Sequence, residues 1–251
     1  MAYELEPNSA EVQNVKSLIH DAKGEIEKSF ESLRKAYTIE PNNWDTSWNL
    51  GSFYYFRSLV FLSIEYYTKL LKLNPLEPMV YMGRATCFFE IGEKDKAESD
   101  FKKALEINPN HVFVLDSYLY ILFWSKRYEE AENIIKKLEK INPNTSDFKK
   151  YSSLRTCMDV LRNTKDNTVV NNLDDYNKYR INTLLENSEE VIQYLNDKFE
   201  LDTKLDYSRY IWLNKNPINY FLHSDPRFQE ILAKHKEIYE ENLAKYGDID
   251  I

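Results

Sequence analysis

Apolar and polar positions recur along the chain with a fixed period. Leu or Ile stands two residues before each of five prolines, and Asn follows four of them. Because proline lacks an amide donor and disfavours a helical residue before it, each proline marks the end of a helix. The five prolines are spaced 34 residues apart throughout: Pro7, Pro41, Pro75, Pro109 and Pro143. This period predicts stacked units that bury their apolar faces only against their neighbours.

Small and large residues alternate in a regular order between the prolines. The third full repeat carries Tyr81, Arg84, Ala85, Phe88, Gly92, Ala97, Phe101 and Ala104 before its proline. This order resembles the tetratricopeptide repeat, whose pattern runs Trp, Leu-Gly, Tyr, Ala, Phe and Pro. The fourth repeat departs from it at Leu119, where a small residue is expected, and the first repeat departs at Lys16 and His20. The resemblance implies an all-α, right-handed superhelical solenoid of antiparallel helix pairs.

The resemblance divides the chain into two regions. Residues 1–145 form the repeat array, with a partial repeat at 1–9 and full repeats at 10–43, 44–77, 78–111 and 112–145. Residues 146–251 form a helical C-terminal capping region. Residues 2–7 align with residues 36–41, so the sequence begins inside a repeat. We therefore hypothesise that the chain is the C-terminal portion of a longer protein.

The capping region no longer follows the period of the repeats. Apolar residues at helical spacing predict a helix over 148–161, a polar loop follows at 163–172, and further helices are expected near 173–186, 188–200 and 206–222. Asp225 as N-cap and Pro226 at the first helical position predict where the last helix begins. Residues 222–232 resemble the end-of-group segment that closes repeat arrays in bacterial signalling proteins.

Composition excludes several classes of partner. The net charge of -8 provides no positive field for nucleic acid or an anionic membrane. No segment approaches the length of a membrane span or follows the pattern of a signal peptide. Cys87 and Cys157 cannot form a disulfide framework and have no CxxC partners, so they indicate a reducing compartment. We expect a cytoplasmic protein.

No pattern of catalytic or ligand-binding residues emerges. The four histidines are far apart and lack metal-ligand spacing, the five glycines form no phosphate-binding loop, and Cys87 lies in a packed repeat. Acidic pairs such as Glu129-Glu130 are typical of exposed helix starts. We therefore predict no enzyme activity, no cofactor and no metal.

The concave face of the array is the remaining candidate site. In the family that the chain resembles, the first helix of each pair lines a groove through its second, fifth, ninth and twelfth residues. Carried over, these positions are Asp45, Trp48, Ser52, Tyr55, Met79, Met82, Thr86, Phe89, Phe113, Asp116, Tyr120 and Phe123, with Asn49 beside them. Only Asn49 approximates the Lys, Arg and Asn set with which many relatives bind a C-terminal carboxylate.

Such an apolar, methionine-containing groove favours the apolar face of a helix or peptide, and we expect a protein scaffold that binds one. Two alternatives remain. The chain's own helices, especially 206–222 with Tyr207 and Trp212, would fill the groove and make it a structural or dimerisation module that regulates an enzymatic domain outside the chain. A small ligand is the other possible occupant.

Overall fold

The array is built of helix pairs, and each pair ends two residues before one of the periodic prolines. A computed structural model describes residues 8–143, 148–162, 167–204 and 207–247. The partial repeat expected at 1–9 falls mostly outside these residues. The four pairs are α1 (Ala10–Ala22) with α2 (Ile26–Ile39), α3 (Trp44–Phe56) with α4 (Val60–Leu73), α5 (Pro78–Glu90) with α6 (Lys94–Ile107), and α7 (Val112–Trp124) with α8 (Tyr128–Ile141).

The turn inside each pair adopts the same left-handed backbone. Gly24 and Gly92 have φ of 72° and 82°, and the equivalent residues Ser58 and Lys126 have φ of 61° and 59°. These four positions are spaced by the repeat period. The first and third repeats meet this requirement with glycine, which adopts positive φ without steric cost. The sharp turn lets the two helices of a pair run antiparallel and in contact.

Small residues decide how closely neighbouring helices approach. Tyr67 of α4 lies against the backbone of α3 and α5, because a Cβ at Gly51 or Gly83 would lie 2.8 Å from its ring. Ala85 and Ala97 are fully buried in the third pair.

Arg84 takes a place where the repeat pattern has leucine, and its guanidinium binds both carboxylate oxygens of Asp100 at 2.7 and 2.8 Å. The ion pair therefore takes the place of an apolar contact between α5 and α6.

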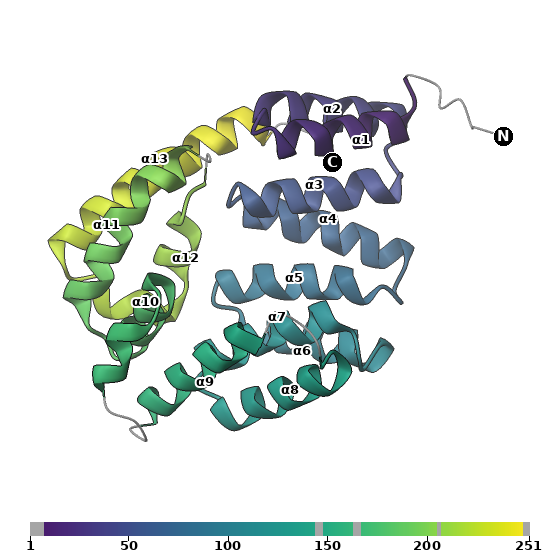
Figure 1. Cartoon of the computed structure of the whole chain (residues 1–251). Helices are drawn as coiled ribbons and strands as arrows, with labels where there is room; N and C mark the ends of the chain where they lie inside the picture. The colour runs from purple at the N-terminus through teal and green to yellow at the C-terminus, as the bar shows by residue number, and fades with distance from the viewer. Residues whose placement is uncertain (1–7, 144–147, 163–166, 205–206, 248–251) are drawn as a thin grey trace.

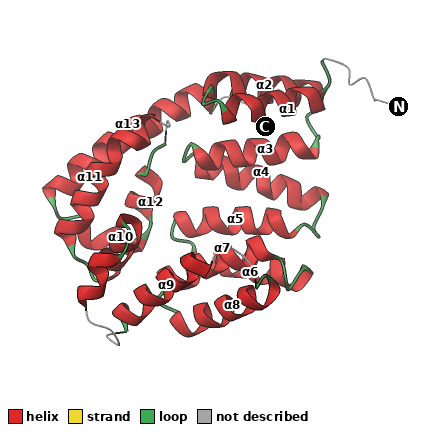
Figure 2. Cartoon of the chain, in the orientation of Figure 1, coloured by secondary structure: helices red, strands yellow, loops and turns green. Residues whose placement is uncertain are grey.

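The C-terminal region continues the helical stack and then turns back along it. Its elements are α9 (Phe148–Leu161), the short 3-10 helix η1 (Asn167–Asn172), α10 (Asp175–Leu184), α11 (Ser188–Lys204), α12 (Tyr210–Lys215), the 3-10 helix η2 (Pro217–Leu222) and α13 (Pro226–Tyr246). The side chain of Asp225 accepts a hydrogen bond from the amide of Arg227, which confirms the predicted start of the last helix. The part of the chain that is described contains helices and loops without a strand, as Figure 2 shows.

The last helix returns to the first repeats, so the molecule forms a closed ring (Figure 1). The ring of Tyr246 lies 5.1 Å from that of Phe30 on α2 and 5.3 Å from that of Phe53 on α3. Tyr54 donates a hydrogen bond to the carbonyl of Tyr246. Tyr246 is 1% exposed, so it belongs to the apolar core of the first two pairs. The predicted all-α solenoid of helix pairs is confirmed. Closure of the ring by α13 is a feature that was not predicted.

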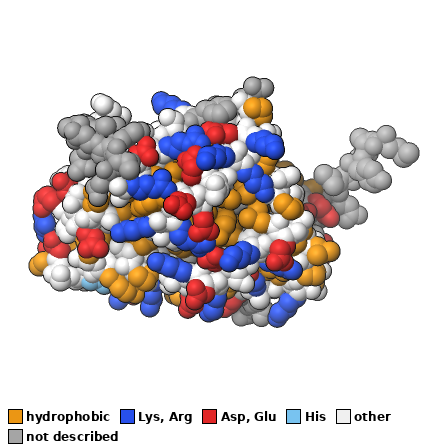
Figure 3. Space-filling model, turned by 90° about the horizontal axis from the view of Figure 1, so that it is seen from below, with side chains coloured by type: hydrophobic (Ala, Val, Ile, Leu, Met, Phe, Trp, Pro, Cys, Tyr) orange, Lys and Arg blue, Asp and Glu red, His pale blue; other side chains and the backbone are white. Residues whose placement is uncertain are grey.

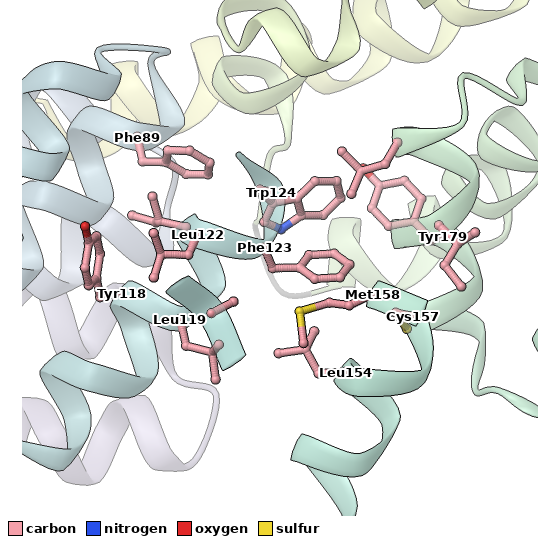
Figure 4. Close-up of a cluster of buried hydrophobic side chains, with 14 of the residues drawn as sticks. Phe89, Tyr118, Leu119, Leu122, Phe123, Trp124, Leu154, Cys157, Met158 and Tyr179 are labelled. Carbon is pink, nitrogen blue, oxygen red and sulfur yellow. The ribbon is translucent and has the colours of Figure 1, made fainter. Parts of the chain in front are cut away.

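The main apolar core extends from the third and fourth pairs into the C-terminal helices. Figure 4 shows Trp124 of α7 between Phe89 of α5 and Tyr179 of α10, with Met158 of α9 below them. These four residues are at most 4% exposed. The array and the capping region therefore share one continuous core.

Candidate functional site

The first helices of the second, third and fourth pairs lie side by side and carry the predicted groove residues. Helix α5 contacts both α3 and α7. Between these helices runs an open depression of about 360 Å³, which we call the trough. Its lining residues are Trp48, Ser52, Tyr55, Phe56, Tyr67, Met82, Gly83, Thr86 and Ser117. No side chain in this set carries a charge, so the trough suits an apolar guest.

Packed aromatic side chains form one side of the trough. Trp48 stacks on Trp44 with 5.8 Å between ring centroids and lies 5.6 Å from Tyr67. The hydroxyls of Ser52 and Tyr67 are 3.4 Å apart. On the other side, Ser117 donates a hydrogen bond to the sulfur of Met82. The predicted residues Trp48, Ser52 and Met82 therefore meet at one surface.

Two of the predicted groove residues are almost completely buried. Phe89 and Phe123 are 1% and 0% exposed. Trp212 of α12 lies 5.8 Å from the ring of Phe89, and the side-chain amide of Asn216 donates to the carbonyl of Phe89. Arg180 of α10 lies over the ring of Phe123. The C-terminal helices cover this end of the groove, so the prediction that both residues face a partner is not met in this structure.

Four other predicted residues, Asp45, Met79, Phe113 and Asn49, do not line the trough. Asp45 is exposed, Met79 is half-buried, and neither lines the depression. Phe113 is 68% exposed. Asn49 donates a hydrogen bond to the side chain of Asn14 on α1, so its amide connects α3 to α1.

Beyond the trough, the C-terminal helices enclose a second space of about 300 Å³, which we call the chamber. Tyr55, Thr86 and Ser117 line both spaces, so the two are contiguous. The predicted residues Asp116 and Tyr120 also line the chamber. Its remaining lining residues are Phe89, Glu90, Leu119, Ile121, Trp124, Lys150, Leu154, Tyr176, Tyr179, Arg180, Tyr207, Arg209 and Trp212.

Glu90 is an acid of the chamber without a counter-ion among the described residues. Protein surrounds it, although the chamber leaves part of its side chain accessible. The hydroxyl of Tyr55 donates to its Oε1 at 3.0 Å, and within the described ranges it forms no ion pair. Burial raises the pKa of Glu90 from its ordinary 4.5 to about 7. The Tyr55 hydrogen bond and the charge of Arg209 oppose this increase only in part.

The other charged side chains of the chamber are engaged. Lys150 binds both carboxylate oxygens of Asp116 at 2.6 and 2.5 Å. Arg209 pairs with the buried Asp202. Arg180 donates to Asn177 through Nη1 and lies 4.3 Å from the centroid of Tyr176, and its buried Nε has no hydrogen-bond partner among the described residues.

Neither thiol is a candidate nucleophile. Burial raises the pKa of the Cys87 thiol, and it raises the pKa of Cys157 to about 12. A thiol that remains protonated at neutral pH is a poor nucleophile. The described segments also hold no group of three or more His, Cys, Asp or Glu side chains placed to bind a metal.

Sequence reasoning missed the chamber, although it left one signal. Glu90 takes the thirteenth position of its repeat, where the other full repeats have Ala22, Phe56 and Trp124. An acid in an otherwise apolar column indicates a local requirement for charge. Its neighbour Arg209 comes from a distant segment without periodicity, and no sequence pattern connects the two.

Surface charge is mixed. On the face shown in Figure 3, basic and acidic side chains are interspersed around apolar patches. In the part of the chain that is described, no helix is both long and apolar enough to cross a membrane.

These features define the class of the fold, and comparison with known proteins agrees with it. Models of the tetratricopeptide repeat match residues 10–43 and 78–111, so the chain carries tetratricopeptide repeats, within a solenoid of helix pairs. A solved tetratricopeptide repeat protein from Parabacteroides merdae shares the fold, with a TM-score of 0.53 and 19% identity, over 95% of this chain and 99% of that one.

Curated relatives match shorter segments. The chain is similar to small glutamine-rich tetratricopeptide repeat-containing protein 2 of Mycosarcoma maydis, with 38% identity over 66 residues, which are 26% of this chain and 19% of that protein. It is also similar to Hsp70-Hsp90 organizing protein 2 of Arabidopsis thaliana, with 26% identity over 85 residues, which are 34% of this chain and 15% of that protein. The matches thus span less than a fifth of the length of either relative.

Proposed function

We propose that this chain is a non-catalytic protein-interaction scaffold, and that its trough binds an apolar segment of a partner. The observation that supports this most directly is the composition of the trough. Its lining contains one tryptophan, one phenylalanine, two tyrosines and one methionine, and none of its side chains is charged. An accessible apolar depression on a soluble domain is typical of an interaction site. Methionine adapts to guests of different shape.

The partner segment contributes side chains from one face. Trp48, Tyr67 and Met82 lie within one depression of about 360 Å³, which has room for a few apolar side chains. Each buried side chain contributes roughly 1.5–3 kcal/mol, so two or three support a micromolar complex after the cost of association. An amphipathic helix or a short extended peptide presents such a row.

Selection of peptides from a random displayed library tests this proposal. We expect uncharged, apolar peptides to be enriched, and Trp48→Ala and Met82→Ala each to weaken the selected peptide at least about tenfold, which corresponds to about 1.4 kcal/mol. Leu76→Ala is the matched control, because Leu76 is 69% exposed on the loop before α5 and away from the trough. Equal affinity for all four proteins, or no enrichment, would contradict the proposal.

A second function is favoured by the helix that covers part of the groove. Ile211 and Trp212 of α12 pack against the array, as expected if residues 206–222 fill the groove. The chain then serves as a self-filled module that dimerises or regulates an enzymatic domain outside it, as in the signalling proteins whose end-of-group segment residues 222–232 resemble. A dimer measured by light scattering, together with a library that selects no peptide, would support this function over the first.

A further inference from the structure

The chamber differs from the trough in its degree of enclosure and in its chemistry. Eight of its eighteen lining residues are aromatic. They come from α3, α5, α7, α10 and the segment that contains α12, so the folded ring as a whole builds this space. A volume of about 300 Å³ is at the lower end for small-molecule sites.

Within this aromatic lining, one acid lacks a partner of opposite charge. Tyr55 offers Glu90 a neutral donor, and in the described part of the chain no lysine or arginine lies within ion-pair distance of it. The nearby Arg209 is already bound to Asp202 through its Nη2 at 3.0 Å and through its Nε. A buried carboxylate without a counter-ion is costly, and a bound cation removes that cost.

The cations of the chamber lie against aromatic rings or an acid, whereas Glu90 has only the Tyr55 hydroxyl, and this difference favours a cationic ligand. Arg180 lies over the rings of Tyr176 and Tyr120, at 4.3 and 5.3 Å from their centroids. It also donates to Asn177, whose amide in turn donates to Asp174. Lys150 is neutralised by Asp116. Aromatic rings around an acid attract cations through their negative faces.

We propose that the chamber binds an organic ammonium ion, with Glu90 as its counter-ion and aromatic side chains around its alkyl groups. The cation is either a free amine or a lysine side chain of a bound peptide, since both present the same group. The site does not depend on the trough, because Glu90, Tyr207 and Trp212 line the chamber alone.

The pH dependence of binding follows from the groups that face Glu90. These are Tyr55 from α3, Cys87 from α5, and Tyr207 and Arg209 from the segment before α12. The tyrosines and the thiol stay neutral around neutral pH, because burial raises the pKa of Tyr55, Cys87 and Tyr207. Arg209 stays charged, because burial, which lowers its pKa, is outweighed by the hydrogen bond to Asp202. Of these groups, only Glu90 changes charge near pH 7, so ammonium binding displaces its proton below that pH.

Calorimetric titration of the full chain with n-butylammonium, 1-butanol and butanoate tests the proposal. We expect one n-butylammonium to bind, about tenfold more weakly at pH 6 than at pH 8, with nearly one proton released at pH 6. Glu90→Gln keeps the shape and the Tyr55 contact, and we expect it to lose at least about tenfold in affinity. Glu65→Gln, at an exposed position on α4, should bind as the original chain does.

The outcomes separate the possible ligands. Blocked lysine (N-acetyl-lysine N-methylamide) that binds as n-butylammonium does indicates a peptide lysine, whereas binding of n-butylammonium alone indicates a free amine. Equal binding of 1-butanol would show a merely apolar space, and preference for butanoate would show an anion site at Arg180 or Arg209. Either result overturns the proposal, as does a folded Glu90→Gln protein with unchanged affinity, or the absence of any binding.

Discussion

Glu90→Gln should make the protein more stable at neutral and alkaline pH and leave its stability unchanged in acid. The unfolded chain ionises this carboxyl around its ordinary pKa of 4.5, whereas the folded chain ionises it around 7. Between these values the folded state binds more protons, so stability falls as the pH rises. Each pH unit corresponds to about 1.4 kcal/mol, so the loss is about 3 kcal/mol and is complete above pH 7.

In the original chain, the titration of His235 offsets the loss of stability caused by Glu90. Burial lowers the pKa of His235 from 6.5 to about 4, with a smaller contribution from the charge of Arg209. The unfolded state then binds more protons between these values, so stability rises by about 3 kcal/mol as the pH rises to 6.5. The two contributions have opposite signs and overlap. We therefore expect a nearly flat profile for the original chain and a rising profile for Glu90→Gln.

Urea unfolding followed by far-UV circular dichroism, at several values from about pH 4 to about pH 8, measures both profiles. The quantity to compare is the difference in unfolding free energy between the variant and the original chain at each pH, which removes the contribution of His235. Glu65→Gln controls for the loss of one acid. If the difference for Glu90→Gln stays constant across this range, the reasoning about burial of Glu90 is refuted.

Three further substitutions test the packing, each by urea unfolding. Arg84→Met leaves the carboxylate of Asp100 unpaired and should cost about 3 kcal/mol, much of which a second change, Asp100→Leu, should restore; equal losses in the single and double variants would contradict this. Gly83→Ala places a methyl 2.8 Å from the Tyr67 ring and should cost about 2 kcal/mol; an unchanged midpoint would show that the ring does not limit the approach of the helices. Trp212→Ala removes the cover of Phe89 and should cost about 3 kcal/mol; an unchanged midpoint would show that α12 is not part of the core.

The helix pairs were predictable because their signals are local. Each periodic proline ends a helix that stops two residues before it, and Asp225 with Pro226 sets the start of α13. The second helices repeat small residues such as Ala97 and Ala131 at contacts within the pair, and both are fully buried. These features depend on a few neighbouring residues, so one sequence is enough to identify them.

Closure of the ring and the contents of the chamber were not predictable in the same way. In the sequence, nothing distinguishes Tyr246 from other aromatic residues on an amphipathic helix, although its ring contacts α2 and α3. Phe89 fits the groove pattern, but Trp212 covers it. Such contacts join segments far apart in the sequence, and only the three-dimensional path of the chain brings them together.

The contact between the last helix and the first repeats changes how the array can unfold from its ends. A linear solenoid can fray from an end, because an end unit holds only one neighbour. In this protein Lys245 binds Glu27, and Tyr246 inserts into the first apolar core, so the terminal helix gives the opening pair a second neighbour. Because its two ends are joined, the array cannot change its curvature at one repeat unless the other repeats change with it.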